Sequence, residues 1–207
     1  MEIRTLSDGA VWLSPPTAAD TDVIIARCQD PSIGEWTTIP VPYGPAEAEK
    51  FFADFVVPGW AARSPTWALR LAADGPVIGM IGLEQKDPSA CEIGFWLASE
   101  HRGRGHMARA VGLVCGFGFA ADGMGLARIS WRAFVGNYSS AAAVRRNGFH
   151  YEGRARLGGL AARRPARRVA GGSPAQRSTG PGRRMARGVP RAPRHCLPWV
   201  MTGIAGS

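Results

Sequence analysis

The stretch EHRGRGHMARA, residues 100–110, holds the residues best suited to chemistry in this sequence. Gly103 and Gly105 are separated by one arginine and come directly before a run with helical periodicity. A glycine turn that leads into a helix offers backbone N–H groups and the positive end of the helix dipole to an anion. Arg102 and Arg104 add positive charge beside the turn. The combination predicts a loop that binds a pyrophosphate group.

Two classes of pyrophosphate loop fit this spacing. Gly103-x-Gly105-x-x-Ala108 matches the fingerprint of dinucleotide-binding folds, in which the turn follows the first strand and a carboxylate closes the next one. Here the turn follows several expected antiparallel strands, and the next strand ends in Val135-Gly136 without a carboxylate. The position of the turn therefore favours a pyrophosphate loop of another class.

Hydrophobic periodicity and turn residues indicate the elements that position the loop. Asp74-Gly75 is typical of a two-residue hairpin turn, and residues 32–44 read as a loop or broken helix. The order of elements predicts an α/β protein with layered helices and a mixed, mostly antiparallel sheet, not a doubly wound fold. Strands are expected at 10–16, 66–73, 76–85, 90–98, 126–135 and 149–157, and helices at 17–30, 45–57, 107–124 and 137–148.

Charge is distributed unevenly along the chain. The 207 residues carry a formal net charge of +9, which on its own would suggest a nucleic-acid partner. Residues 1–152 hold 13 of the 25 basic and all 16 acidic residues, a balance of −3, whereas residues 153–207 hold 12 arginines and no acid. We expect a domain at 1–157 and an Arg-, Pro- and Gly-rich tail at 158–207, disordered or out of frame, with nucleic-acid contact only through that tail.

The cellular setting follows from what the sequence lacks. It has no run of eighteen apolar residues, so we expect no membrane span. The N-terminus lacks a basic segment followed by an apolar one, so no signal peptide is expected. Cys28, Cys91, Cys115 and Cys196 are scattered without metal-ligand spacing. This pattern predicts a cytoplasmic protein with neither a disulfide framework nor a metal site.

Three motifs around the loop narrow its class. They are EIGFW at residues 92–96, Asn-x-x-Ser at residues 137–140 and Asn-Gly-Phe at residues 147–149. Together with the RGRG turn they resemble the GNAT family of N-acetyltransferases, and are most similar to its ribosomal-protein-alanine acetyltransferase branch. The resemblance covers residues 10–157. It implies a GNAT fold, acetyl-CoA as cosubstrate, and as acceptor a primary amine of a protein N-terminus or small molecule, in a monomer or homodimer.

The resemblance also assigns binding residues. Met107 departs from the Gly or Ala that the family often has at that position. Trp36 and Tyr43 lie in a loop that borders the acceptor pocket in the family, although packing in the loop or core is the alternative. The residues expected to contact the cofactor are Phe95, Trp96, Leu97, Arg102, Gly103, Arg104, Gly105, His106, Met107, Ala108 and Asn137.

An amine acceptor must lose a proton before it attacks a thioester. Glu92 is the candidate base, and a solvent-facing strand carboxylate is the alternative. Ser140 resembles the family's serine that protonates the leaving thiolate. Asn137 or Ser139 capping a helix is the alternative interpretation of that motif. No cysteine falls at a catalytic position of the family, so we expect direct transfer without an acyl-enzyme.

The tail departs from the family, whose members usually end in a further strand with Asp and an aromatic before a GLL run. Residues 165–178 hold no such pattern. Back-translated with permitted codons and read from the second nucleotide, they can give PRDAWRVGLLRSD. We hypothesise a frameshift between Gly158 and Pro165, which removes the last strand. A genuine basic arm for RNA or the ribosome is one alternative, and a degenerate domain that binds coenzyme A without turnover is another.

Overall fold

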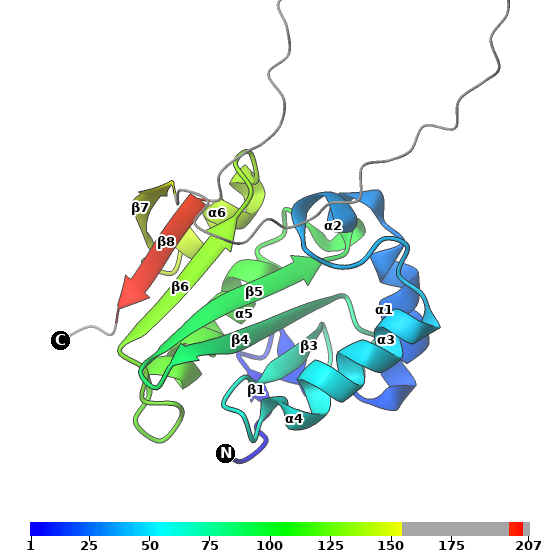
Figure 1. Cartoon of the computed structure of the whole chain (residues 1–207), viewed down its shortest axis with the longest axis horizontal. Helices are drawn as coiled ribbons and strands as arrows, with labels where there is room; N and C mark the ends of the chain where they lie inside the picture. The colour runs from blue at the N-terminus through cyan, green and yellow to red at the C-terminus, as the bar shows by residue number, and fades with distance from the viewer. Residues whose placement is uncertain (155–198, 205–207) are drawn as a thin grey trace, which may run out of the picture.

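An eight-stranded sheet with helices on both faces forms the core of the computed structural model, which describes residues 1–154 and 199–204 (Figure 1). The strands lie in the order β1-β2-β3-β4-β5-β6-β8-β7, and only β5 and β6 are parallel neighbours among them. The expected α/β class with a mostly antiparallel sheet is confirmed. The strands are β1 (Leu6–Ser7), β2 (Trp12–Ser14), β3 (Thr66–Arg70), β4 (Gly79–Asp87), β5 (Ala90–Leu97), β6 (Arg128–Ala133), β7 (His150–Arg154) and β8 (Trp199–Ile204).

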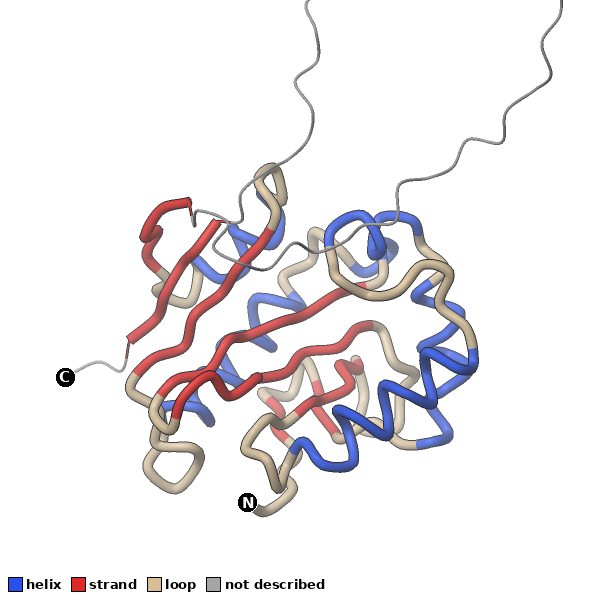
Figure 2. Tube along the Cα trace, viewed as in Figure 1, coloured by secondary structure: helices blue, strands red, loops and turns tan. Residues whose placement is uncertain are grey.

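The helices divide between the two faces of the sheet, as the blue and red segments of Figure 2 show. Helices α1 to α4 cover one face, and α5 and α6 lie on the other. Among the described residues, no helix is long and apolar enough to cross a membrane. The helices are α1 (Thr21–Cys28), α2 (Pro31–Trp36), α3 (Pro45–Phe51), α4 (Val57–Gly59), α5 (His106–Phe119) and α6 (Tyr138–Arg145), with short turns η1 (Ala18–Asp20), η2 (Phe52–Val56) and η3 (Ser99–His101).

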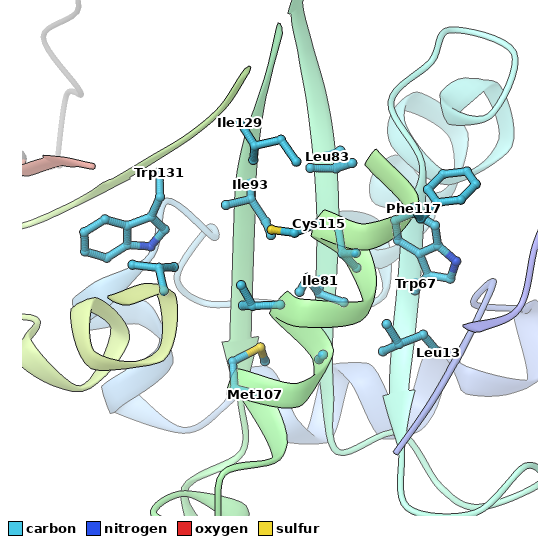
Figure 3. Close-up of a cluster of buried hydrophobic side chains, with 14 of the residues drawn as sticks. Leu13, Trp67, Ile81, Leu83, Ile93, Met107, Cys115, Phe117, Ile129 and Trp131 are labelled. Atoms are coloured by element: carbon cyan, nitrogen blue, oxygen red, sulfur yellow. The ribbon is translucent and has the colours of Figure 1, made fainter. Parts of the chain in front are cut away.

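The main core lies between α5 and the centre of the sheet (Figure 3). Apolar side chains recur on α5 at helical spacing, and Val111, Val114 and Cys115 are buried against β4, β5 and β6. Trp67 of β3 is fully buried and meets the ring of Phe117 edge to face at 5.6 Å. Because α5 is fixed to the sheet by this packing, the loop that precedes it is held in a defined place.

The connection from β3 to β4 corrects the expected two-residue hairpin. The last paired residues are Leu69 and Gly79, so the connecting loop is longer than two residues. The guanidinium of Arg70 donates to the carbonyl of Gly75 in this loop at 2.7 Å and to both oxygens of Asp20 at 2.8 Å. Arg70 and Asp20 are both buried, and this bidentate contact joins the loop to the start of α1.

Strand β8 corrects the expectation that the tail supplies no strand. It lies between β6 and β7 and pairs antiparallel with both, for example Thr202 with Ser130 and with His150. The strand was missed because the tail was judged by its Pro- and Arg-rich composition, although Trp199, Val200, Thr202 and Ile204 are residue types that favour strands. Residues 155–198, on which the frameshift hypothesis and the domain boundary at 157 rest, lie outside the described residues.

Candidate functional site

The glycine turn leads from β5 through η3 to α5. Gly103 has φ 76° and Gly105 has φ 81°, both in the left-handed region that favours glycine. No heavy atom lies within 4 Å of the position that a Cβ would take at either residue. The conformation therefore calls for glycine, and the open space at both positions leaves the backbone accessible to a ligand.

The N-terminus of α5 presents unused hydrogen-bond donors. Gly105 is its N-cap residue and no side chain caps the helix. The first internal bond runs from Arg109 N–H to the Gly105 carbonyl at 3.1 Å, so the N–H groups of residues 106–108 have no acceptor within the helix. Met107 sends its side chain into the core, where it is 7% exposed. A large residue is therefore accommodated where the family often has Gly or Ala.

The electrostatic environment of the turn is positive. Burial, followed by the charges of Arg27 and Arg104, lowers the pKa of His101. The pKa of His106 is lowered by burial and by neighbouring positive groups, which include Arg104 and Arg109. Burial is the larger cause of both shifts, and the arginine charges that add to them make the surroundings of the turn more favourable to an anion.

The two arginines of the turn have different surroundings. Arg102 Nε donates to the carbonyl of Leu97 at 2.9 Å, and its Nη2 lies 3.9 Å from Asp30 Oδ2. These contacts direct Arg102 toward β5 and α2. Arg104 is exposed and makes no ion pair within the part of the chain that the structure describes. Arg104 is therefore the arginine of the turn whose charge stays available to a ligand.

The corner between α1 and α2 fixes the turn from the other side. Arg27 of α1 forms an ion pair with Glu100 of η3. Asp30 caps α2 by accepting from the N–H of Ser32 at 2.9 Å. Burial acts to raise the pKa of Asp30, but hydrogen bonds from Ser32 and Ser99 and the charge of Arg102 lower it below its ordinary value. The corner is thus joined to the turn by charged side chains.

Strands β5 and β6 diverge beside the glycine turn. They are paired from Ala90 with Arg128 to Ile93 with Trp131, and β5 continues to Leu97 without further pairs to β6. Figure 1 shows the two ribbons diverging beyond this point. Phe95 and Leu97 pack toward the main core and Trp96 toward the second cluster under α1 and α3. The parted edge of β5 offers backbone groups next to the glycine turn.

Glu92 lies on β5 at the base of this divergence. It shares a sheet face with Gly94 and Trp96, opposite the core-facing Ile93. Its carboxylate lies 3.2 Å from Arg132 Nε and 4.0 Å from Lys86 Nζ, and its side chain is 22% exposed. The carboxylate is therefore a half-buried member of an ion-pair group and not a freely solvated strand residue.

Asn137 and Ser140 lie at the start of α6. The side chain of Asn137 accepts from the N–H of Ser140 at 3.2 Å, so Asn137 caps this helix as the alternative interpretation proposed. Next to it, a Cβ at Gly136 would lie 3.3 Å from Trp36 Cη2. The structure thus brings Trp36 of α2 beside the start of α6.

Tyr43 lies apart from this group. Its side chain is 6% exposed in the second core cluster, and burial raises its pKa to about 12. Its position agrees with the core-packing alternative. Within the described part of the chain, Glu92 and Ser140 form no hydrogen bond with each other.

Sequence reasoning did not find Arg109, Arg146 and Asn147. With Arg104, Gly105, Ala108 and Gly112 they line a surface depression of about 420 Å³ beside the turn. Arg109 and Gly112 follow Gly105 at helical spacing, and Arg146-Asn147 belongs to the run RRNG. Only the packing of α6 against α5 brings these two stretches together.

Comparisons with known proteins agree with this arrangement. The family model described as "Acetyltransferase (GNAT) domain" matches residues 10–150. The Bacillus subtilis (strain 168) protein YdaF, named as a candidate ribosomal N-acetyltransferase, is 30% identical over 151 residues, which are 70% of this chain and 79% of YdaF.

Solved structures with low sequence identity share the fold. A spermidine N-acetyltransferase from Vibrio cholerae, solved with CoA and spermine, has a TM-score of 0.65 at 15% identity and covers 95% of this chain and 96% of its own. A ribosomal-protein alanine acetyltransferase from Vibrio fischeri has a TM-score of 0.63 at 20% identity, and the match covers 73% of this chain and 86% of that one. The microcin self-immunity acetyltransferase MccE, solved with acetyl-CoA and AMP, has a TM-score of 0.68 at 14% identity. The match covers 96% of this chain and 94% of MccE.

Proposed function

The chain belongs to the acetyltransferase (GNAT) family and is an N-acetyltransferase, and we propose that it transfers the acetyl group of acetyl-CoA to a primary amine by direct attack. The observation that carries this proposal is the uncapped N-terminus of α5 behind two glycines of positive φ. That geometry suits the pyrophosphate of coenzyme A, because several N–H groups converge on one anion.

The parted edge of β5 supports the binding of the rest of the cosubstrate. A pyrophosphate at the amides of residues 106–108 leaves the pantetheine arm to run along Phe95, Trp96 and Leu97 toward the base of the divergence. The backbone of these residues provides donors and acceptors for the amides of the arm. Asn137 borders the arm from the β6 side.

The chemistry requires one proton to leave the amine and one to reach the sulfur. The amine nitrogen attacks the thioester carbonyl carbon, and Glu92 takes the proton from the nitrogen. The bond from carbon to sulfur breaks as the tetrahedral intermediate collapses, and Ser140 donates its hydroxyl proton to the leaving thiolate. Solvent then takes the proton from Glu92 and returns one to Ser140, so both side chains regain their starting states. Arg132 and Lys86 hold the carboxylate of Glu92 in place for this role.

The described cysteines support direct transfer. Burial raises the pKa of Cys28 to about 12, that of Cys91 to about 11 and that of Cys115 to about 12. A thiol must ionise to act as an acyl-accepting nucleophile, so these three side chains are unsuited to carry an acetyl group. They are buried and free of disulfides, which supports a reducing, cytoplasmic setting.

The acceptor that we propose is the N-terminal amine of a protein, with a small amine as the alternative. The resemblance to YdaF and the position of Trp36 beside the start of α6 support a site that accepts an extended chain end. Aromatic side chains at such positions supply contact area with little loss of conformational freedom.

Calorimetric titration tests the cosubstrate, and a thioester-release assay tests the acceptor. We expect acetyl-CoA to bind and NADH not to bind. A peptide with a free N-terminal alanine should release coenzyme A, whereas the same peptide with a blocked N-terminus should not. Binding of NADH alone would overturn the proposal.

A further inference from the structure

Lys86 places a primary amine beside the proposed base. It lies near the end of β4, and its Nζ is 2.7 Å from Glu84 Oε1 and 4.0 Å from Glu92 Oε2. The side chain is 38% exposed, so the amine reaches the carboxylates and still contacts solvent. Glu84 and Glu92 face each other directly in the register of β4 and β5. The ion-pair group that holds Glu92 therefore contains the kind of functional group on which the enzyme is proposed to act.

The sheet face that carries Glu92 is open toward the proposed position of the thioester. Gly94 follows Glu92 on this face and is exposed, and no heavy atom of the described residues lies within 4 Å of the position that a Cβ would take there. Same-face positions on a strand are about 7 Å apart. A change in the rotamers of the flexible four-carbon stem of Lys86 is therefore enough to bring its amine from Glu92 toward Gly94.

The sequence contains one other lysine, which serves as an internal reference. Lys50 and Lys86 are the two lysines of the chain, and its other basic residues are arginines, which stay protonated and do not attack thioesters. Lys50 lies on α3, is 74% exposed and pairs with Asp54, which is not a residue of the proposed site. Acetylation by free acetyl-CoA in solution should therefore favour Lys50, whereas acetylation by the proposed site should favour Lys86.

We propose that Lys86 is a modification site at which the chain acetylates itself. The inference rests on the proposed function. The ammonium of Lys86 first gives one proton to solvent, and the neutral amine attacks the thioester carbonyl carbon. Glu92 takes the second proton as the bond from nitrogen to carbon forms. The bond from carbon to sulfur then breaks, and the thiolate receives the hydroxyl proton of Ser140, which solvent restores. The products are Nε-acetyl-lysine and coenzyme A.

Arg132 lets the modified chain keep a partner for its base. Acetylation removes the positive charge of Lys86 and with it the ion pairs to Glu84 and Glu92. The Nε of Arg132 lies 3.2 Å from Glu92 Oε2, and this contact does not involve Lys86. The carboxylate of Glu92 therefore stays paired with one cation after the modification, so the acetylated protein should remain folded and its acetyl group can be located.

Incubation of the full chain with acetyl-CoA that carries an isotope-labelled acetyl group, without an added acceptor, tests the proposal. Peptide mass mapping should find about tenfold or more label on Lys86 than on Lys50, because a positioned base assists only Lys86. The rate of labelling should be independent of protein concentration, because the acetyl donor and the acceptor amine are bound to the same chain.

Two variants of matched shape identify the base. Glu92→Gln removes the proposed base, and Glu84→Gln removes the nearer carboxylate partner of Lys86. We expect Glu92→Gln to lower the labelling of Lys86 by about 10²-fold or more, and Glu84→Gln to keep or raise it. Spontaneous acetylation predicts a rise in Glu92→Gln as well, because the loss of a nearby carboxylate favours the neutral amine. Labelling that is unchanged or higher in Glu92→Gln therefore overturns the inference.

Release of coenzyme A with the peptide acceptor, measured on the same preparation, separates this inference from the proposed function. Peptide turnover without label on Lys86 overturns the inference and leaves the proposed function standing. The absence of both reactions overturns both proposals. Equal labelling of Lys50 and Lys86 assigns the reaction to solution chemistry, and a rate that rises with protein concentration assigns it to a second molecule, so either result also overturns the inference.

Discussion

The two sides of the proposed site satisfy their charges differently. On the cofactor side the amides of residues 106–108 have no acceptor in the helix, and Arg104 and Arg146 have no carboxylate among the described residues. On the acceptor face Glu92 lies between Arg132 and Lys86, and Lys86 also pairs with Glu84 at 2.7 Å. The first side therefore has hydrogen-bond donors and positive charges without partners in the described part of the fold, whereas the charges of the second side are largely paired with one another.

We expect this difference to separate the residues that set the affinity for acetyl-CoA from those that set the rate of transfer. Unused donors add binding energy when a ligand arrives, because no internal partner is lost. A self-satisfied ion-pair group holds its members in position, which suits a residue that must act on a reacting atom and not bind it tightly. Changes on the cofactor side should therefore alter the dissociation constant, and changes on the acceptor face should alter kcat.

The largest effect is expected from Glu92→Gln, which removes the proposed base and keeps the side-chain shape. We expect kcat to fall by about 10²–10⁴-fold at neutral pH, with acetyl-CoA affinity little changed. Much of the loss should recover at high pH, where free amine is abundant. The measurement is a pH profile of thioester release.

Glu84→Gln is the control for this change. Glu84 lies directly opposite Glu92 on β4 and shares its sheet face. It should leave kcat within a few-fold of the wild-type value. Equal losses in the two variants would assign the effect to the ion-pair group and not to a base.

Gly105→Val should act on the cofactor side instead. A β-branched side chain disfavours φ 81° and fills the open space in front of the helix amides. We expect acetyl-CoA affinity to fall by about 100-fold, the loss of several charge-assisted hydrogen bonds. Isothermal titration of the folded variant measures this.

The strain of positive φ needs its own control. Gly125→Val provides it, because Gly125 has φ 60° and an equally open Cβ position, and it lies beyond the far end of α5. It should lose stability and keep its affinity. If both variants bind acetyl-CoA normally, the turn is not part of the site.

The frameshift hypothesis predicts a smaller effect, on stability. Restoring the alternative frame after Gly158 should supply the family's own final strand in place of β8, and should raise both the melting temperature and the turnover. About 1 kcal/mol of added stability corresponds to roughly 2–4 °C in a chain of this size. Thermal melts and thioester-release assays of the two versions measure this.

Deletion of residues 199–207 from the printed sequence is the companion change. It removes β8 and exposes the facing edges of β6 and β7, so its melting temperature should fall. A printed sequence that is both more stable and more active than the restored one would make the arginine-rich tail a genuine part of the protein.

The smallest effect concerns pH. The pKa of His106 is lowered in the folded protein from an ordinary value of 6.5, so folding favours its neutral form. Its contribution is complete above pH 6.5 and is lost as the pH falls through that value toward the folded pKa. The melting temperature should therefore drop less between pH 7.5 and 5.5 in His106→Gln than in the wild-type protein. An equal drop in both would assign the acid sensitivity to other groups.

The glycine turn could be predicted from the sequence because its backbone conformation is a local property. The requirement for glycine at 103 and 105, and the helix that follows, are local properties of a short stretch. The Asn137 cap is equally local. These features need no knowledge of distant contacts.

The rest depends on pairings that only the folded chain creates. The local sequence does not predict that Arg102 lies near Asp30, or that Arg132 and Lys86 flank Glu92. The depression at Arg146 requires Asn147 to clip α6 onto α5 across 39 residues. Strand β8 was missed for a related reason, since its six residues follow a long Pro- and Arg-rich stretch that gives no hint of a partner.

The place of β8 has a consequence for the order of folding. Strands β6 and β7 are close in the chain, but the strand that lies between them is separated from Arg154 by residues 155–198. Pairing of strands that are so far apart in the sequence is slow compared with pairing of neighbours. We therefore expect the rest of the sheet to form before β8 inserts between β6 and β7. Refolding should show a slow phase that disappears when residues 199–207 are removed.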